Sequence, residues 1–327
     1  MKKAVATLLP GAFWLLLSLP AIAGQGNDPQ SWLDRMTAAM SQMTYQGTFV
    51  YVQGDELQTM RITHVSDENG VRERLVSLSG SKSEIIRDAD GVLWIPGDGR
   101  SVLSDSAYRR SYFPEMPLQD GSPALESYTV ELGGDALIAG HNARVVKVLP
   151  RDHYRYGYTL WLEKHSGLLL KWELFDTRRK PLAKLMFTDL SLGPEVDQTE
   201  LKSKGELKEL ETVKSRLPTA STVTSRKPRW QPTKLPPGFV LTSHRYVASG
   251  DNDGGEYEHL VYSDGLAAVS VYVESPQDGK SLPEMTHQHG TSNAFICSAS
   301  GMVVTVVGDV PVPTVAMIGK SVETSLP

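Results

Sequence analysis

The residues best suited to metal chemistry are two histidines, His287 and His289, separated by one residue. On an extended chain this spacing places both imidazoles on one face, where they could share a metal ion with His259 as a third ligand. Histidines in such a turn-rich segment are more often solvated, so we expect no metal site here. Residues 251–256 carry acidic side chains in the manner of a calcium loop. They lack its alternate-ligand register and its distal glutamate, which favours a simple hairpin tip.

Catalysis by a nucleophile or a nucleotide has little support in the chain. The sequence contains no G-x-S-x-G elbow, no phosphate-binding Walker loop, no G-x-G-x-x-G and no H-E-x-x-H. The single cysteine, Cys297, follows Ala294-Phe295-Ile296, an apolar setting typical of a buried and inert thiol. We therefore expect a protein that is not an enzyme, without catalytic residues, cofactor or metal. The 38 acidic residues leave a carboxylate-based envelope hydrolase open as the weakest alternative.

Large aromatic residues are frequent in the strand-like segments of the first 200 residues. The candidates for a lipid cavity are Phe49, Tyr51, Trp94, Trp161, Trp172 and Phe187. They are more numerous than a thin, one-sided core requires, and the concave face of a half-open barrel can hold an apolar ligand. For any one of them, packing between a sheet and a helix is the ordinary role, so only the collective cavity is predicted.

A short basic segment follows a stretch of small polar residues. It contains Arg226, Lys227, Arg229 and Trp230. Arginine and tryptophan are frequent anchors of interfaces, and in an acidic protein such a patch suits an acidic peptide or an anionic lipid head group. A merely solubilising linker explains the same residues equally well.

The elements that must position these residues can be read from periodicity and turn signals. Asp28-Pro29 and the apolar spacing after it predict one amphipathic helix ending near Gln42. Alternating segments then predict strands, separated by turns that include Gly133-Gly134. The predicted strands cover residues 45–53, 57–65, 72–78, 83–87, 92–95, 128–132, 143–149, 158–163, 168–175 and 182–190. About ten short strands indicate one large antiparallel sheet, strongly curved or partly closed, because closure avoids long bare edges.

A second, smaller domain is predicted after a change in composition. Residues 201–235 are charged at first and then rich in Ser, Thr and Pro, which is typical of a mobile linker. Strands are expected at 239–247, 257–263, 266–274 and 302–307, and a closing helix at 312–321. The predicted organisation is a signal peptide at 1–23, a large half-barrel domain at 24–200, the linker, and a small α+β domain at 236–327.

Composition and the N-terminus restrict the compartment and the partners. Lys2-Lys3, an apolar run and Ala21-Ile22-Ala23 form the pattern of a secretory signal peptide cleaved after Ala23. The formal net charge of -5 makes binding to nucleic acid by bulk charge unfavourable. One cysteine allows no internal disulfide, so we expect an exported periplasmic protein whose two domains are joined by the linker alone and move freely.

Five segments together resemble the RseB/MucB family. They read MTYQGTFVYV at 43–52, MRITH at 60–64, RERLVSL at 72–78, YSDGLAAVSVYVE at 262–274 and GMVVTVVGDVP at 301–311. The resemblance covers nearly the whole chain. It implies a large domain similar to the LolA/LolB lipoprotein carriers, an unclosed barrel with helices, joined to a small domain. None of the matching segments is a catalytic motif, and the resemblance carries over no individual site residues.

The same resemblance implies a function in the envelope stress response. It implies a periplasmic negative regulator of a sigma-E/AlgU-type sigma factor, whose partner is the periplasmic part of a membrane-spanning anti-sigma factor. Such a regulator protects its partner from the site-1 protease, and lipid or lipopolysaccharide releases it. A periplasmic lipid or lipoprotein carrier is the alternative, although a carrier needs neither a second domain nor a linker. Self-association, the partner-binding surface and the identity of the lipid stay open.

Overall fold

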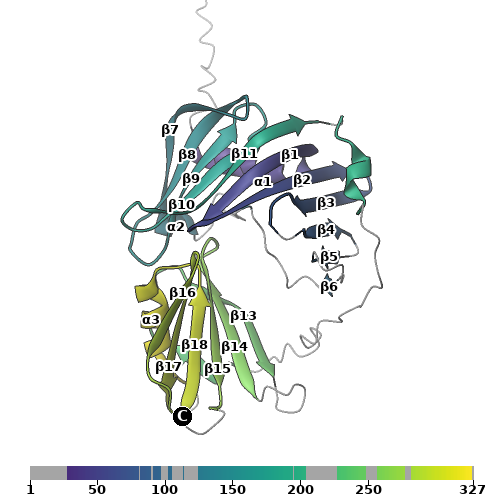
Figure 1. Cartoon of the computed structure of the whole chain (residues 1–327). Coiled ribbons are helices and arrows are strands. Elements are labelled where there is room, and N and C mark those ends of the chain that lie inside the picture. The colour runs from purple at the N-terminus through teal and green to yellow at the C-terminus, as the bar shows by residue number, and fades with distance from the viewer. Residues whose placement is uncertain are drawn as a thin grey trace, which may run out of the picture.

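The computed structural model describes most of the chain between residues 28 and 325. The described ranges are 28–80, 82–89, 91–96, 102–104, 113, 124–193, 195–203, 227–247, 256–276 and 281–325. The predicted signal peptide and most of the predicted linker lie outside them. The described residues form two antiparallel sheets, a large one and a small one, and the small sheet lies against one end of the large one (Figure 1).

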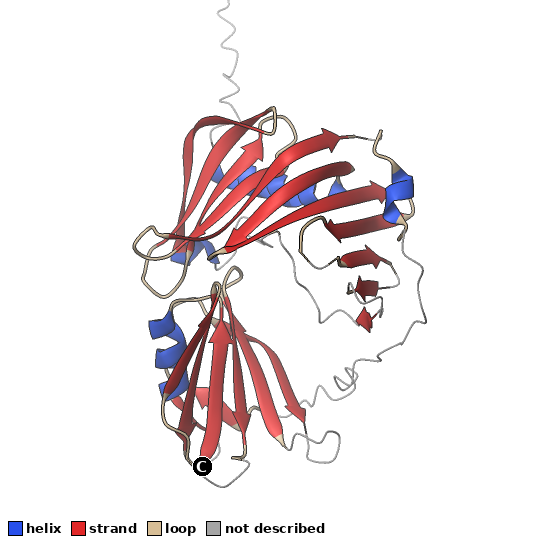
Figure 2. Ribbon diagram, in the orientation of Figure 1, coloured by secondary structure: helices blue, strands red, loops and turns tan. Residues whose placement is uncertain are grey.

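The first helix, α1 (Pro29–Gln42), forms where the sequence predicts it. The Asp28 carboxylate accepts hydrogen bonds from the backbone N–H groups of Gln30 and Ser31, both at 3.2 Å, and proline occupies the first turn, where its missing N–H costs nothing. The apolar face of the helix buries Trp32 and Met36 against the large sheet (Figure 2).

The described part of the large sheet has eleven strands in the order β6-β5-β4-β3-β2-β1-β11-β10-β9-β8-β7. The strands are β1 (Tyr45–Gln53), β2 (Glu56–Asp67), β3 (Gly70–Ser77), β4 (Glu84–Asp88), β5 (Gly91–Ile95), β6 (Val102–Ser104), β7 (Tyr128–Ile138), β8 (His141–Pro150), β9 (Gly157–Glu163), β10 (Leu169–Phe175) and β11 (Pro181–Leu192). Neighbours follow one another along the chain except in the middle, where β1 pairs with β11. Since β6 and β7 stand at opposite edges, the sheet is not closed, and the predicted half-open architecture is confirmed.

The core of the large sheet lies under α1. Phe49 and its cross-strand partner Phe187 are at most 1% exposed and belong to the same buried cluster as the helix. Gly47 is required here by close approach, because a Cβ at this position would lie 2.5 Å from the backbone oxygen of Asp189. Two short helices, α2 (Ala124–Ser127) and η1 (Gln198–Leu201), complete this part of the chain.

The turn predicted at Gly133-Gly134 is wrong. Both glycines lie inside β7, at a β-bulge where the register to β8 shifts between Leu132 and Asp135. A Cβ on Gly133 would lie 2.9 Å from the Val145 side chain, so this glycine marks close packing within a bulged strand rather than a chain reversal.

The small sheet has six described strands in the order β13-β14-β15-β18-β17-β16. They are β13 (Val240–Val247), β14 (Tyr257–Ser263), β15 (Ala268–Glu274), β16 (Met285–His289), β17 (Ser292–Ala299) and β18 (Met302–Gly308). The helix α3 (Val312–Lys320) packs on β17 and β18, as the sequence predicts for a closing helix. The hairpin β16–β17 was not predicted from the sequence.

The end of the predicted linker is also structured. Trp230–Pro232 form β12, which pairs with β19 (Val322–Thr324) in a separate two-stranded sheet. The chain therefore becomes regular before residue 235, because backbone hydrogen bonds to the C-terminal strand hold it.

Candidate functional site

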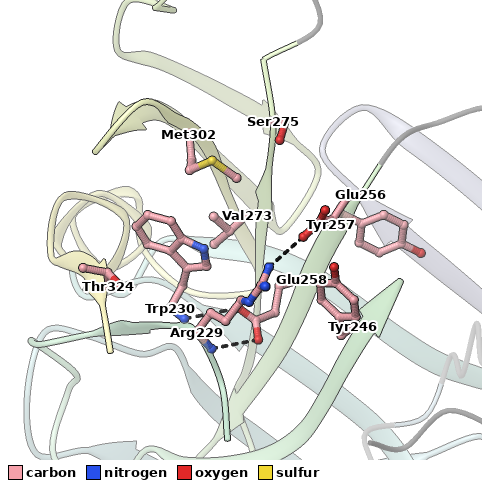
Figure 3. A pocket seen from close by; sticks show the side chains of 10 residues that line it. All are labelled: Arg229, Trp230, Tyr246, Glu256, Tyr257, Glu258, Val273, Ser275, Met302 and Thr324. Carbon is pink, nitrogen blue, oxygen red and sulfur yellow. Dashed lines mark hydrogen bonds and ion pairs between the residues drawn. The ribbon is translucent and has the colours of Figure 1, made fainter. Parts of the chain in front are cut away.

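The basic segment ends in a pocket on the small sheet. Arg229 and Trp230 line this pocket of about 350 Å³ together with residues from four strands of the small sheet and the C-terminal end (Figure 3). The other lining residues are Tyr246, Glu256, Tyr257, Glu258, Val273, Ser275, Met302 and Thr324. Aromatic and apolar side chains with a few convergent polar groups are the usual composition of a ligand site. We call it the Arg229 pocket.

A buried carboxylate fixes the backbone at the pocket. Glu258 on β14 is 3% exposed and accepts hydrogen bonds from the backbone N–H groups of Arg229 at 3.0 Å and Trp230 at 3.2 Å. Its Oε1 also lies 2.6 Å from Nε2 of His244 on β13. Three partners satisfy this carboxylate, so Glu258 anchors the end of the linker segment to the small sheet.

The guanidinium of Arg229 is already paired. Its Nη1 lies 2.8 Å from Oε1 of Glu256, and its centre lies 5.3 Å from the ring of Tyr246 (Figure 3). Its buried Nε has no hydrogen-bond partner within the described residues. The positive charge at the pocket is therefore balanced by a neighbouring carboxylate.

The structure thus brings together only part of the predicted basic patch. Arg229 and Trp230 share the pocket, Lys227 is exposed beside it, and Arg226 lies outside the described residues. The prediction of an anionic ligand at this segment stays a prediction, now centred on Arg229.

Four of the six aromatic candidates gather on the face of the large sheet that α1 covers. Tyr51 pairs with Leu185, which pairs with Trp172, so these side chains share one face, and the Tyr51 and Trp172 rings are 6.0 Å apart. The ring centres of Phe49 and Phe187 lie 5.7 Å apart on the same face. Phe49, Trp172 and Phe187 are buried core residues, Tyr51 is half-buried, and the collective cavity stays a prediction.

The remaining two aromatic residues differ from these four. Trp161 pairs with Lys171, which is one position away from Trp172, so the Trp161 side chain points to the face opposite that of Trp172. The Lys171 ammonium lies 4.0 Å from the centre of the Trp161 ring. Trp94 on β5 pairs with Ile85 on β4, so both side chains lie on the face that α1 covers. Ile85 and Trp94 are only half-buried.

The histidines do not converge. His287 and His289 lie on β16, an exposed edge strand, whereas His259 lies on β14, four strands away, or roughly 19 Å at the usual strand spacing. His259 instead stacks on Tyr272 with ring centres 4.2 Å apart. No group of three His, Cys, Asp or Glu side chains within the described residues could hold a metal ion.

The thiol of Cys297 is buried on β17, as predicted, and burial raises its pKa, which keeps it protonated. Residues 251–255 lie outside the described residues, and the next acidic residue, Glu256, is the partner of Arg229.

The main feature missed by sequence reasoning is a charged contact between the two sheets. Arg155, in the loop between β8 and β9, pairs with Asp264 in the turn between β14 and β15, and both side chains are fully buried. Arg155 also donates to the carbonyl of Pro237 at 2.6 Å, and its guanidinium lies over the rings of Tyr128 and Phe239. A Tyr-Arg-Tyr sequence in a loop is the only signal of this contact, and it is a weak one.

Every polar atom of the Asp264 carboxylate has a partner. Oδ1 accepts the backbone N–H groups of Leu266 at 2.8 Å and Ala267 at 2.7 Å, and Oδ2 accepts the Tyr128 hydroxyl at 3.2 Å beside Arg155. Burial, followed by the charge of Asp264, raises the pKa of Tyr128, so this hydroxyl stays a donor.

Further hydrogen bonds cross between the sheets around this pair. Asn293 donates to the Tyr156 hydroxyl at 2.9 Å, Thr314 donates to the carbonyl of Tyr154 at 2.9 Å, and Gln53 donates to the Thr291 hydroxyl at 3.1 Å. The expectation that a linker alone joins the domains is therefore wrong. A buried ion pair and several hydrogen bonds hold the two sheets together, because the loop at 151–156 projects directly into the small sheet. We call this region the intersheet contact.

The geometry defines a class of protein: a mainly β binding protein with two sheets, a half-open large sheet and a small sheet docked on it. The MucB/RseB N-terminal domain model matches residues 28–205, and the MucB/RseB C-terminal domain model matches residues 224–323. The chain belongs to the MucB/RseB family.

Similar proteins and structures agree with this assignment. The sigma factor AlgU regulatory protein MucB of Pseudomonas aeruginosa is 32% identical over 94% of this chain and 95% of its own length. A crystal structure of MucB in complex with MucA(peri) matches with a TM-score of 0.72 at 29% identity, covering 92% of this chain and all of that chain. A crystal structure of MucB matches with a TM-score of 0.60 at 28% identity, covering 91% of this chain and 98% of that chain.

The curated relative is named as a sigma factor regulatory protein, so the family to which this chain belongs is one of regulators rather than of enzymes. Within the part of the chain that the structure describes, no helix has both the length and the apolarity to cross a bilayer.

Proposed function

We propose that this chain works in the periplasm, where it binds the periplasmic part of a membrane-spanning anti-sigma factor and hinders its cleavage by the site-1 protease. The observation that carries this proposal is the likeness to MucB in complex with MucA(peri), which extends over 92% of the chain and so over both sheets. The predicted signal peptide, residues 1–23, would direct the chain to the periplasm and be cleaved after Ala23.

Protection by masking makes modest demands on the structure. A peptide segment held on a rigid surface cannot enter a protease cleft, so the protected fraction depends only on the occupancy of the regulator. The intersheet contact supplies rigidity, because it fixes two surfaces of the chain relative to each other.

Lipid or lipopolysaccharide is proposed as the signal that loosens the partner. The half-buried Ile85 and Trp94 at the open end of the large sheet would meet acyl chains, and Lys227 and Arg229 would meet anionic head groups. A ligand that binds better to the partner-free arrangement must lower the affinity of the chain for its partner, because the coupling between two ligands is reciprocal.

The test uses the mature chain and the purified periplasmic segment of an anti-sigma factor from the same organism. Calorimetric titration should show binding, and the segment should survive the site-1 protease longer when the chain is present. Adding lipopolysaccharide should weaken binding and restore cleavage. A segment that does not bind overturns the proposal as a whole, and binding that lipopolysaccharide leaves unchanged overturns the signal.

A further inference from the structure

A second, smaller pocket lies at the intersheet contact. It has a volume of about 160 Å³, and residues of both sheets line it. Tyr128, Tyr156 and Tyr158 come from the large sheet, and Leu266, Ala267, Ala268 and Asp309 come from the small sheet. A volume equal to about five water molecules is the size of one long side chain rather than of a lipid. We call it the intersheet pocket.

Among the described residues that line this pocket, only Asp309, which follows β18, is charged. Its Oδ1 accepts the hydroxyl of Thr291 at 3.1 Å and the hydroxyl of Ser292. No ion pair formed within the described residues includes Asp309. In the part of the chain that the structure describes, its negative charge is therefore stabilised by two neutral donors and by no ion-paired cation.

Tyrosines supply the rest of the polar surface. Burial raises the pKa of Tyr158, and the charge of Asp309 adds to the rise, so its phenol stays neutral. The Tyr156 hydroxyl accepts its hydrogen bond from Asn293 at 2.9 Å. Neutral phenol rings beside a carboxylate form a favourable site for a cation, because the ring faces carry negative electrostatic potential.

We propose that the intersheet pocket receives a lysine or arginine side chain of the segment that the chain binds, with Asp309 as its counter-ion and the tyrosine rings as its walls. This rests on the proposed function and assigns part of the partner-binding surface. A long basic side chain fits both the volume and the charge, since its methylene stem covers apolar wall while its head reaches the carboxylate.

The pocket depends on the Arg155–Asp264 pair. Tyr128 lines the pocket and also donates to Asp264, and Leu266 and Ala267 line it while their N–H groups bind the same carboxylate. A cation bound between the sheets therefore binds only the arrangement in which they are in contact, and it stabilises that arrangement.

The experiment is a double-mutant cycle between the chain and the periplasmic segment of the anti-sigma factor. Asp309→Asn removes the charge and keeps an oxygen that can accept from Thr291 and Ser292. We expect it to weaken binding about tenfold or more, the range of close charge pairs at interfaces. Each lysine and arginine of the segment is then changed to alanine. One position should lose most of its effect in the Asp309→Asn background.

Two further variants of the chain complete the test. Ala268→Lys places an ammonium of the chain itself in the pocket, and we expect it to weaken binding of the segment about as much as Asp309→Asn does. Glu131→Gln on β7 and Ser243→Lys on β13 are the matched controls for one lost and one gained charge, both at exposed positions, and we expect neither to change binding. Thermal unfolding of all four variants shows which of them keep the fold.

The outcomes separate this inference from the proposed function. If the unaltered chain does not bind the segment, the proposed function fails. If the unaltered chain binds, and folded Asp309→Asn and Ala268→Lys variants bind equally well, the intersheet pocket is not part of the surface. Coupling that is absent at every basic position of the segment also overturns the inference. Should Asp309→Asn be unfolded, Ala268→Lys decides alone.

Discussion

Two arginine–carboxylate pairs with the same chemistry occupy opposite environments in this protein. Arg155 and Asp264 are both fully buried between the sheets, whereas the side chains of Arg229 and Glu256 are 36% and 40% exposed at the edge of the small sheet. The buried pair joins residues 109 positions apart, and the exposed pair joins residues 27 positions apart. The comparison teaches that burial, rather than residue type, decides what such a pair does for the structure.

The buried pair acts through the completeness of its hydrogen bonds. Taking two charges out of water costs several kcal/mol per ion, and only good geometry with further hydrogen bonds offsets that cost. Arg155 meets this condition with Asp264, Asp152 and the carbonyl of Pro237. The pair therefore fixes how the sheets meet more than it stabilises the chain, while water screens the Arg229 pair and leaves it weak.

The largest expected effect comes from breaking the buried pair. Asp264→Ala removes the fully buried partner of Arg155 and leaves its charge with the partly exposed Asp152 alone, and we expect the free energy of unfolding to fall by about 3 kcal/mol. Denaturant unfolding followed by circular dichroism measures it. Combining Arg155→Met with Asp264→Asn should recover part of the loss, because no buried charge is then left alone. If the double variant loses as much free energy of unfolding as the two single variants lose together, the result contradicts this account.

An intermediate effect is expected from protonating His259. Burial, followed by the charge of Arg245, lowers the pKa of His259 to about 4. In the unfolded chain His259 binds a proton near pH 6.5, whereas in the folded chain it does so only near pH 4. The contribution of neutral His259 to the free energy of unfolding is therefore complete above pH 6.5 and is lost as the pH falls from 6.5 to about 4. The half-exposed ring keeps the loss smaller than that of Asp264→Ala.

The test of this pH dependence compares two histidine variants. His259→Gln should flatten the fall in unfolding temperature between pH 6.5 and 4.5, whereas His289→Gln on the exposed strand β16 should leave it unchanged. Equal behaviour of the two variants would show that the environment of His259 does not matter.

A smaller effect is expected at the hydrogen bond between Tyr156 and Asn293. Tyr156→Phe removes the acceptor of one Asn293 N–H, while the same amide keeps its bond to the carbonyl of Val310 at 2.8 Å. We expect a loss of about 1 kcal/mol, the usual net value of one such bond. Asn293→Ala, which removes both bonds, should cost more in the same denaturant titration, and the reverse order would refute the assignment.

The smallest effect is expected at the exposed pair. Glu256→Gln should change stability by less than about 1 kcal/mol, and added salt should reduce even that difference, because both groups reach water. Unfolding at low and high ionic strength measures it. A loss as large as that of Asp264→Ala would remove the distinction between the two pairs.

Much of the fold was predictable because its signals are local. The cap at Asp28, the apolar spacing of α1 and the alternation of most strands act over a few residues, and the structure agrees with them. The hairpin β16–β17 escaped prediction because its first strand, MTHQH, is exposed on both faces and shows no alternation. The bulge at Gly133 escaped because two adjacent glycines resemble a turn unless the packing of Val145 is known.

The candidate site was predictable only in part. Arg229 and Trp230 were found from composition, yet the carboxylates that organise them lie elsewhere in the chain, Glu258 on β14 and Glu256 directly before it. Trp161 and Trp172 looked equivalent in sequence. The pairing of Trp161 with Lys171 placed them on opposite faces, and a slip of one residue would have exchanged those faces.

The sequence by itself determined the helices α1 and α3, most strands, the half-open large sheet and the family, because these follow from neighbouring residues and from whole-chain similarity. Only the tertiary structure decided that Arg155 meets Asp264 and that Asp309 closes a pocket with three tyrosines of the other sheet. The physical reason is that burial and pairing of charges depend on which distant segments dock. No periodicity within either segment records that docking.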